Sequence, residues 1–424
     1  MRRATIYPYP SVDDLVDHLF RNESPAMLFS DADRDKLVAR WRSRYPRSVT
    51  LTHTRAGDIC HLRFNLLGTS FDFSRTGEID WHREPVSGRR WPIDYVERID
   101  RWLWSDRRPG DYKPIWELGR QQYLVTLGQA YWLTGDERYA EACAAHVLSW
   151  IRANPYPFGI HWYSALEIGI RLIAWGLAFQ FARGSVYFAR VAGHAFVRSV
   201  YQQATHLRAH LTRDWPGRNN HIIGEAAALA FVGALFDELA AASEWRETGL
   251  SLLESELSRQ THPDGVNREQ AIAYHRFVLD FALLLIVLSR RGALRRSLVL
   301  ETVAKGMLEY LMIVAAPDGE FPDLGDADGG RGYALSACSD AEAAREALAI
   351  GAVLFGRPDF KFAAQQFGEG AYWLLGDDGL ATFEAMSAER PRLTSAAFPH
   401  SGHYVIRDSW SRTSDFALMR CGEF

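Results

Sequence analysis

The feature that most constrains this sequence is a helical pattern that repeats from about residue 115 to about residue 370. Within it, apolar residues recur at steps of three and four, the spacing of one helix face. The segments begin roughly every 25 residues, so antiparallel pairs recur roughly every 50, as in helical hairpins stacked into an open solenoid or a closed ring. We expect helices at 116–134, 137–152, 163–183, 187–211, 219–239, 243–259, 270–291 and 298–315, with a weaker pair near 341–366.

The two ends of the chain have different patterns. The first part carries turn residues and short alternating runs, as in "DICHLRFNLLGTSFDF", which predict short helices followed by a few strands. Near the C-terminus, "AFPHSGHYVIRDSW" and "SDFALMRCGEF" alternate apolar and polar residues as strands do. Two strands alone are marginally stable, so we expect them to begin a β-domain that is cut off. The predicted parts are a mixed segment over 1–100, a helical domain over 101–385 and these first strands over 390–424.

The composition limits the binding partners and the cellular compartment that we expect. The net charge of −4 gives no global basic field, so no nucleic-acid partner is expected. The four cysteines lie far apart, which argues against a disulfide framework and a cysteine zinc site. No apolar stretch reaches the roughly 20 residues of a membrane span. The N-terminus lacks a continuous apolar region, so we expect no signal peptide and a cytoplasmic chain, or a periplasmic one if the N-terminus is processed.

Polar and aromatic motifs follow the same period of about 50 residues. Alternate helices point the same way, so these motifs are expected to gather at one end of the array. Most of them lie at helix starts, where free N–H groups and the positive end of the dipole suit an anionic ligand. The alternative is that each motif is only a cap and a turn. The motifs are PIWELGRQQY at 114–123, GIHWYSALE at 159–167, GRNNHIIGE at 217–225, HPDGVNREQAIAYH at 262–275 and FPDLGDADGG at 321–330.

Two asparagines stand at the mouth of an alanine-rich helix, in "RNNHIIGE". Asparagine prefers caps and turns to helix interiors. The side-chain amides of Asn219 and Asn220 can add donors to the backbone N–H groups that face an anion there. For Asn219 the alternative is an ordinary N-cap.

Seven segments of the chain, taken together and in order, resemble a known family. They are PIWELGRQQYLVTLGQAYWLTGDERYA, IRANPYPFG, WYSALEIGIRLIAW, NNHIIGE, PDGVNREQAIAYH, GDADGG and GHYVIRDSW. The family is the heparinase II/III family of polysaccharide lyases, which has relatives among the alginate lyases, and the resemblance covers about residues 80–424. It implies a mainly-α fold: an incomplete (α/α) toroid of helical hairpins, with a small mixed N-terminal segment and the start of an antiparallel β-sandwich domain.

Members of the family are expected to continue where this chain ends, near "MRCGEF". The resemblance implies a glycine- and histidine-rich segment of the β-domain there, which contributes further active-site histidines and, in some members, a metal site. We therefore expect a chain that lacks most of the β-domain, holds no cofactor of its own and has uncertain activity by itself.

The resemblance implies cleavage of a uronic-acid polysaccharide by β-elimination. The C5 proton is removed and the bond from C4 to the bridging oxygen breaks, so the enzyme must neutralise the carboxylate and supply a base and an acid. We assign neutralisation to Asn220, and to His221 the role of base or a share in neutralisation, unless it is a structural histidine. Tyr274 is the proton donor or, as phenolate, the acceptor. The second role requires a pKa lowered from about 10 by basic neighbours, and Arg268, His275 and Arg276 are near in sequence.

Further residues are predicted to bind substrate. Glu225 orients His221 or lies buried beneath the site, and Glu269 and Gln270 fix sugar hydroxyls or Tyr274. Trp side chains stack on sugars or pack the core, and Arg suits sulfate or carboxylate. The acidic segment around Asp326 lacks the full EF-hand spacing, so we expect a tight turn rather than a calcium site. The full substrate-binding set is Asn219, Glu225, Arg268, Glu269, Gln270, His275, Trp116, Arg120, His161, Trp162 and Asp326.

Two other functions compete with the lyase. An inverting glycoside hydrolase on an (α/α) barrel would pair Glu117 with Asp323 or Asp326, with carboxyls roughly 6.5–9.5 Å apart. A catalytically silent sugar-binding fragment is the third hypothesis. The expected ligand is an anionic polysaccharide or oligosaccharide, and heparin or heparan sulfate, alginate, hyaluronan and bacterial exopolysaccharides all stay open, as does the oligomeric state.

Overall fold

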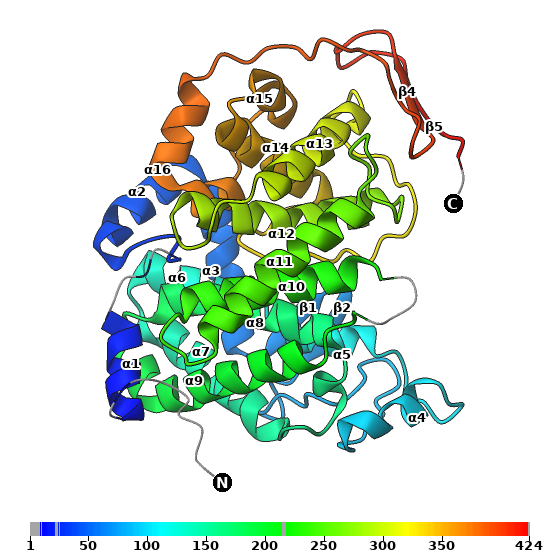
Figure 1. Cartoon of the computed structure of the whole chain (residues 1–424). Coiled ribbons are helices and arrows are strands. Elements are labelled where there is room, and N and C mark those ends of the chain that lie inside the picture. The colour runs from blue at the N-terminus through cyan, green and yellow to red at the C-terminus, as the bar shows by residue number, and fades with distance from the viewer. Residues whose placement is uncertain (1–8, 10, 22–23, 25, 214–217, 423–424) are drawn as a thin grey trace. The chain divides into compact units, whose positions relative to one another are not determined.

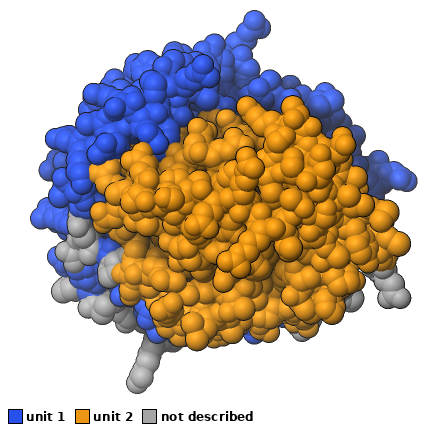
Figure 2. Space-filling model, turned by 90° about the horizontal axis from the view of Figure 1, so that it is seen from above, with its two compact units in different colours: residues 1–215, 228–249 blue, residues 216–227, 250–424 orange. Residues whose placement is uncertain are grey.

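A computed structural model describes two compact units of the chain, which Figure 2 shows in different colours. Unit 1 is made of residues 1–215 and 228–249, and unit 2 of residues 216–227 and 250–424. The described residues are 9, 11–21, 24, 26–213 and 218–422. Residues 1–8, which belong to the segment searched for a signal peptide, and Gly217 of the third motif lie outside them.

Unit 1 begins with short helices and one hairpin, as the sequence predicts (Figure 1). Strands β1 and β2 pair antiparallel, with Arg63 opposite Asp72 and Leu66 opposite Thr69. The elements are α1 (Val12–Arg21), α2 (Arg34–Arg44), α3 (Pro46–Cys60), β1 (Arg63–Leu66), β2 (Thr69–Asp72) and α4 (Asp100–Leu103), with 3-10 turns at Asp31–Asp33, Val96–Arg98 and Ile160–Trp162.

The long helices of unit 1 follow the predicted periodicity with one exception. The helix expected at 116–134 is divided at Gln121, whose backbone has the left-handed φ of 53°. The Gln121 side chain is buried and its Oε1 accepts the indole N–H of Trp175 at 2.8 Å. This break is a tertiary feature that periodicity could not show. The helices are α5 (Lys113–Arg120), α6 (Leu124–Thr134), α7 (Glu137–Ala153), α8 (Ala165–Ala182) and α9 (Val186–Ala209).

Unit 2 contains helical hairpins and a three-stranded antiparallel sheet in the order β3-β4-β5. Two strands were expected from the sequence and three are present. The last helix, α16, is not among the helices expected from the sequence, and Gly376 at φ 65° interrupts its helical geometry. The elements are α12 (Ile272–Arg290), α13 (Leu298–Val314), α14 (Asp340–Phe355), α15 (Pro358–Ala364), α16 (Glu369–Ala385), β3 (Ala396–Phe398), β4 (His403–Arg407) and β5 (Phe416–Arg420).

The division between the units falls within α10 (Asn220–Leu235) and α11 (Ala242–Gln260). Serine caps fix the starts of several other helices, because each hydroxyl accepts an N–H that the helix leaves unpaired. Ser164 caps α8, Ser185 caps α9, Ser297 caps α13 and Ser339 caps α14, the last as a full capping box with Glu342.

Two helices qualify by composition as membrane spans, although the sequence analysis expected no apolar stretch of that length. Helices α8 and α12 have the length and composition of a membrane span. Inside the protein, however, 100% of the apolar stretch of α8 and 83% of that of α12 is buried. Helix α8 also buries Glu167 and Arg171. Core helices of a globular protein have these properties, so the two helices are weak indicators of a membrane.

A close backbone approach fixes the loop that precedes α12. Gly265 has a φ of 86°, and its N–H donates to His262 at 2.9 Å. A Cβ at this position would lie 2.3 Å from the carbonyl oxygen of Gly306 in α13. The loop that carries the fourth motif therefore packs directly on the α13 backbone, and only glycine fits there.

We predict that Gly265→Ala destabilises the protein more than Gly292→Ala does. Both glycines have left-handed backbones, which cost another residue about 1–2 kcal/mol. At Gly292 a Cβ would meet nothing within 4 Å, whereas at Gly265 it would meet backbone, and overpacking of this kind adds about 1–3 kcal/mol. Urea unfolding of the two variants measures the difference, and equal losses would show that the loop moves away from α13 freely.

Candidate functional site

In unit 2, the structure joins Asn220 to Glu269 through two hydrogen bonds. Asn220 is the first residue of α10, and its backbone N–H donates to Glu269 Oε1 at 2.8 Å. Its side-chain amide donates to Glu269 Oε2, also at 2.8 Å. Asn220 is buried, and burial raises the pKa of the Glu269 carboxyl while the two bonds from Asn220 lower it. The Glu269 carboxylate therefore already accepts hydrogen bonds from donors that the sequence analysis assigned to an anionic ligand.

The neighbouring residues of this helix start have distinct positions. Asn219 Oδ1 accepts the backbone N–H of His221 at 3.2 Å, so Asn219 does serve as an N-cap. His221 is half-buried one residue into the helix, and Glu225 is fully buried one turn further on. The prediction that both His221 and Asn219 reach substrate stays a prediction.

Tyr274 lies in the first turn of α12 and bonds to the acidic loop. Its hydroxyl donates to Asp328 Oδ2 at 3.0 Å. Burial raises the pKa of Tyr274 well above its ordinary value, and the charges of Asp328, Asp326 and Glu269 raise it further. The sequence reasoning looked to basic neighbours for a lowered pKa. The structure surrounds the phenol with carboxylates instead, so it is held protonated.

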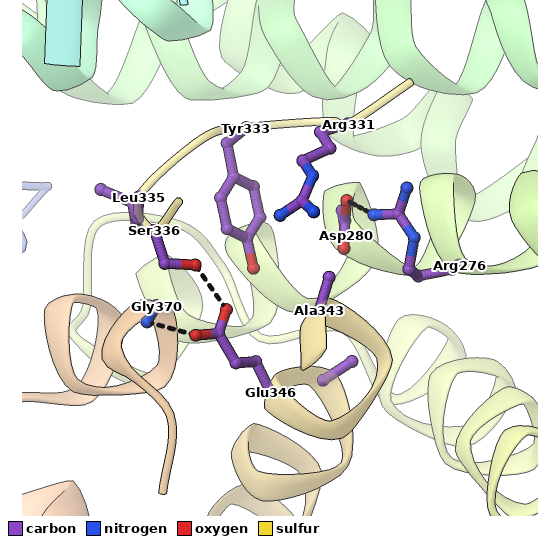
Figure 3. Close-up of a pocket in the computed structure, with 10 residues that line it drawn as sticks. Arg276, Asp280, Arg331, Tyr333, Leu335, Ser336, Ala343, Glu346 and Gly370 are labelled. Carbon is purple, nitrogen blue, oxygen red and sulfur yellow. Dashed lines mark hydrogen bonds and ion pairs between the residues drawn. The ribbon is translucent and has the colours of Figure 1, made fainter. Parts of the chain in front are cut away.

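A polar network around Arg276 and Asp280 of α12, which Figure 3 shows, anchors the acidic loop. Arg276 donates to Asp280 at 2.9 Å and also to the carbonyl oxygen of Gly330. Asp280 accepts the backbone N–H of Gly332 at 3.2 Å. These bonds tie α12 to the segment just after Asp328, which holds the carboxylate near the phenol.

The network borders a cavity of about 20 Å³, into which Tyr333 and Arg331 reach from the loop in Figure 3. Glu346 of α14 accepts from Ser336 at 2.9 Å and from the backbone N–H of Gly370 at 2.8 Å. Small-molecule sites begin at roughly 300 Å³. The cavity is therefore a structural feature and too small for a sugar.

The remaining predicted residues of unit 2 divide between surface and interior. Arg268 and Asp326 are exposed. Gln270 is buried and has a left-handed φ of 55°. His275 is buried, its Nε2 lies 2.9 Å from Met307 O, and its Nδ1 accepts the N–H of Asn267 at 3.3 Å. Burial lowers the pKa of His275 to about 4, so this ring is a neutral packing element beneath the loop.

His403 of β4 is a residue that the sequence reasoning did not single out. Its Nδ1 lies 2.8 Å from the hydroxyl of Tyr310, whose ring packs against His275 with centroids 4.9 Å apart. The ring is fully buried, and Nε2 has no hydrogen-bond partner among the described residues. Burial, followed by the charge of Arg420, lowers the pKa of His403. The strand pattern of "HYVIR" held the signal, since its alternation puts His403 on the same buried face as Val405.

In unit 1, the first two motifs also meet. Arg120 donates to both oxygens of Glu167, at 2.6 and 2.8 Å, and to Glu117 at 2.7 Å. This guanidinium is therefore already engaged by two carboxylates. Burial raises the pKa of Glu117, while Arg120 lowers it. The Trp116 indole N–H donates to the carbonyl of Ile160 at 3.2 Å, which links the two motifs a second time.

Two predicted ligand contacts of unit 1 are core residues. His161 and Trp162 are each 1% exposed. His161 Nε2 lies 2.8 Å from Trp81 O, and burial holds its pKa well below the ordinary value. The Trp162 indole donates to Asn154 O at 3.1 Å. The core alternative for Trp162 thus fits the structure better than sugar stacking.

The motifs therefore meet in two sets, one within each unit. In unit 2 the third motif joins the fourth through Asn220 and Glu269, and the fourth joins the fifth through Tyr274 and Asp328. Among the described residues, no group of three or more His, Cys, Asp or Glu is placed to hold a metal ion. The unit 2 set offers amide donors, a protonated phenol and carboxylates, which are groups for binding and proton transfer.

Comparisons with known proteins all indicate the same family. The sequence profile described as Heparinase II/III N-terminus matches residues 44–338. A heparin-sulfate lyase of Pedobacter heparinus is 24% identical over an alignment of 345 residues, and the match covers 78% of this chain and 47% of that protein. A heparin-sulfate lyase of Bacteroides stercoris is 23% identical and is matched over 78% of this chain and 48% of its own length. The chain thus spans about half the length of the curated relatives it matches.

Solved structures show the same fold. The crystal structure of heparinase III superimposes with a TM-score of 0.66 at 18% identity, over 96% of this chain and 57% of that one. The heparan sulfate lyase HepC of Pedobacter heparinus gives a TM-score of 0.61 at 22% identity, over 96% and 56%. The predicted fold class, mainly α with the helical hairpins of an (α/α) toroid and a small antiparallel sheet at the C-terminus, is confirmed.

We predict that Asn220→Ala lowers the free energy of unfolding by about 1–3 kcal/mol at neutral pH, because an oxygen of the half-buried Glu269 carboxylate loses its donor. The loss also raises the pKa of Glu269 further, since Asn220 lowers it in the native protein. A folded-state pKa above the unfolded value means that stability falls as pH rises through this range. The cost of the substitution should therefore shrink in acid.

Carbon-13 NMR titration of Glu269 and unfolding at several pH values measure both effects. Asn219→Ala is the control. It removes an N-cap, costs about 1 kcal/mol and should leave the Glu269 titration unchanged. A Glu269 pKa that is equal or lower in Asn220→Ala would contradict the pairing.

Proposed function

Because this chain belongs to the heparinase II/III family, we propose that it is a polysaccharide lyase that cleaves a uronic-acid-containing polysaccharide of the heparin-sulfate type by β-elimination. Its curated relatives bear the name heparin-sulfate lyase. The observation that carries the proposal is the cluster in unit 2, where an asparagine amide, a raised-pKa carboxyl and a protonated phenol meet through Asn220, Glu269 and Tyr274.

Asn220 is the proposed neutraliser of the substrate carboxylate. An amide donates hydrogen bonds without a proton equilibrium, and it carries two N–H groups. Glu269 accepts one of them. Burial raises the pKa of Glu269, and a substrate carboxylate beside it would raise that pKa further, so Glu269 takes up a proton more readily as the second carboxylate enters. Donors held in place before reaction stabilise the enolate-like anion that forms when the C5 proton leaves.

Tyr274 is the proposed general acid. The bond from C4 to the bridging oxygen breaks in the elimination, and that oxygen needs a proton. The raised pKa keeps the phenol protonated at neutral pH, and Asp328 orients the hydroxyl through the bond at 3.0 Å. Tyr274 is therefore better suited to donate than to accept a proton in this state. We assign the base to His221, the remaining predicted catalytic residue.

The competing carboxylate-pair hydrolase is less well supported. Its acid or base, Glu117, accepts a hydrogen bond from Arg120 at 2.7 Å, and its side chain is 11% exposed. A pair of carboxyls must instead face the sugar from two sides with a water between one of them and the ring. The proposed lyase chemistry needs no metal at the Asn220 cluster.

We predict that Tyr274→Phe lowers turnover by about 10²–10⁴-fold, the usual loss of one acid or base, and leaves polysaccharide binding nearly intact, because only the hydroxyl is removed. Initial rates and binding are measured separately on the same preparation. Tyr201→Phe in α9 is the matched control, since it removes a phenol hydroxyl outside the five motifs. Unchanged turnover in Tyr274→Phe would remove this residue from the mechanism.

The reaction class has its own test. Elimination leaves a C4–C5 double bond at the new non-reducing end, so products from heparan sulfate should absorb in the ultraviolet. They should carry no oxygen from labelled water at the cleaved bond. Spectrophotometry of the products measures the absorbance, and mass spectrometry after reaction in labelled water measures the incorporated oxygen. Saturated products that contain the label would reject the lyase and favour a hydrolase.

A further inference from the structure

A second cavity of unit 2 is lined by none of the residues assigned to catalysis. Its volume is about 280 Å³, close to the roughly 300 Å³ at which small-molecule sites begin. Four segments form it: the turn after α13, helix α14 through Arg345, the end of α15, and the end of β4 with the residues that follow. The lining side chains that matter here are Arg345, Phe362, Arg407, Trp410 and Arg412.

The lining carries three guanidinium groups and no carboxylate. Arg345 donates to the carbonyl of Gly319 at 2.6 Å. Among the described residues, neither it nor Arg407 nor Arg412 has a carboxylate within the 4.0 Å of a salt bridge. The charge of Arg345 does lower the pKa of Glu342 on the same helix, but that side chain is not part of the lining. The cavity is therefore a concentrated positive site.

Arg407 is the most informative of the three arginines. It is 4% exposed, and its guanidinium lies 3.9 Å from the ring centre of Trp410. One nitrogen, Nη2, donates to the carbonyls of Ile313 and Ala315 at the end of α13. Its Nε is buried and has no hydrogen-bond partner among the described residues. Burying a cation with an unused donor is costly unless a partner is supplied.

The carbonyls at the end of α13 explain only part of this arrangement. A helix C-terminus carries partial negative charge and stabilises a cation, so Arg407 has a structural role as a cap. That role leaves its Nε unused, and it requires neither Arg345 nor Arg412 on the same cavity wall. Guanidinium groups bind sulfate and carboxylate oxygens with matched, charge-assisted hydrogen bonds.

We propose that this cavity binds an oxyanion group, sulfate or carboxylate, carried by a sugar ring. The oxyanion lies between the guanidinium groups of Arg345, Arg407 and Arg412. The sugar ring contacts the apolar wall that Phe321 and Phe362 supply. Binding here involves no bond cleavage, so the site is separate from the elimination chemistry and acts as a second point of attachment for an anionic saccharide.

The test is calorimetric titration of the protein at constant ionic strength. The probes are N-acetylglucosamine 6-sulfate, glucuronic acid, the neutral N-acetylglucosamine and sodium sulfate. We expect one binding event for the two anionic sugars, none for the neutral sugar, and weaker binding of sodium sulfate. The double variant Arg345→Gln/Arg412→Gln should weaken binding at least tenfold, because it removes two of the three charges and leaves the buried Arg407 cap in place.

Two controls separate this site from general effects. Arg47→Gln removes an exposed charge from unit 1 and should not change binding, and thermal unfolding of the double variant checks its fold. Tyr274→Phe should bind the probes as the wild type does, so failure here is distinguishable from failure of the lyase proposal. Absence of binding, equal binding by the double variant, or sodium sulfate that binds as tightly as the sugar sulfate would each overturn the proposal.

Discussion

A buried arginine holds unit 1 together. Arg171 of the fully buried helix α8 donates to Gln203 at 2.7 Å, to the carbonyl of Gly119 at 3.2 Å and to that of His161 at 3.1 Å. Its guanidinium also lies 4.1 Å from the ring centre of Trp150. Burial lowers its pKa to about 9, yet its hydrogen bonds join α8 to α9, to the end of α5 and to the turn before α8. A buried charge is tolerated only with such partners, so these segments have one arrangement.

Unit 2 also buries charged side chains, and there they form an ion pair. Arg276 and Asp280 lie one turn apart on the apolar helix α12, and burial raises the pKa of Asp280 while Arg276 lowers it. Their remaining hydrogen bonds go to the backbone at Gly330 and Gly332. The cost of burying the pair is thus offset by anchoring the acidic loop. That loop in turn holds Asp328 on the phenol of Tyr274, so a stability requirement of the core positions a candidate catalytic group.

Burial also sets the chemical state of the candidate site. Tyr274 and Glu269 both have raised pKa values, and desolvation is the largest cause for each. A protonated phenol and a carboxyl with a raised pKa suit a site that must receive a substrate carboxylate. Burial also argues against two of the residues predicted to bind substrate. His161 and His275 are neutral and buried, and their Nε2 atoms lie against backbone carbonyls.

The sequence by itself determined most of the helices, α16 and the break at Gln121 excepted, because apolar spacing is a local property that any amphipathic or buried helix must show. It also indicated which motifs carry hydrogen-bond donors and proton donors, including Asn220 and Tyr274. For Asn219 it offered an N-cap as the alternative to substrate binding. Only the tertiary structure decided their partners. Asn220 meets Glu269 49 positions later and Tyr274 meets Asp328 54 positions later, and no local pattern encodes such pairs. Desolvation likewise depends on everything that packs around a group. For that reason the direction of the Tyr274 pKa and the buried positions of His403 and Arg407 could be seen only in the folded chain.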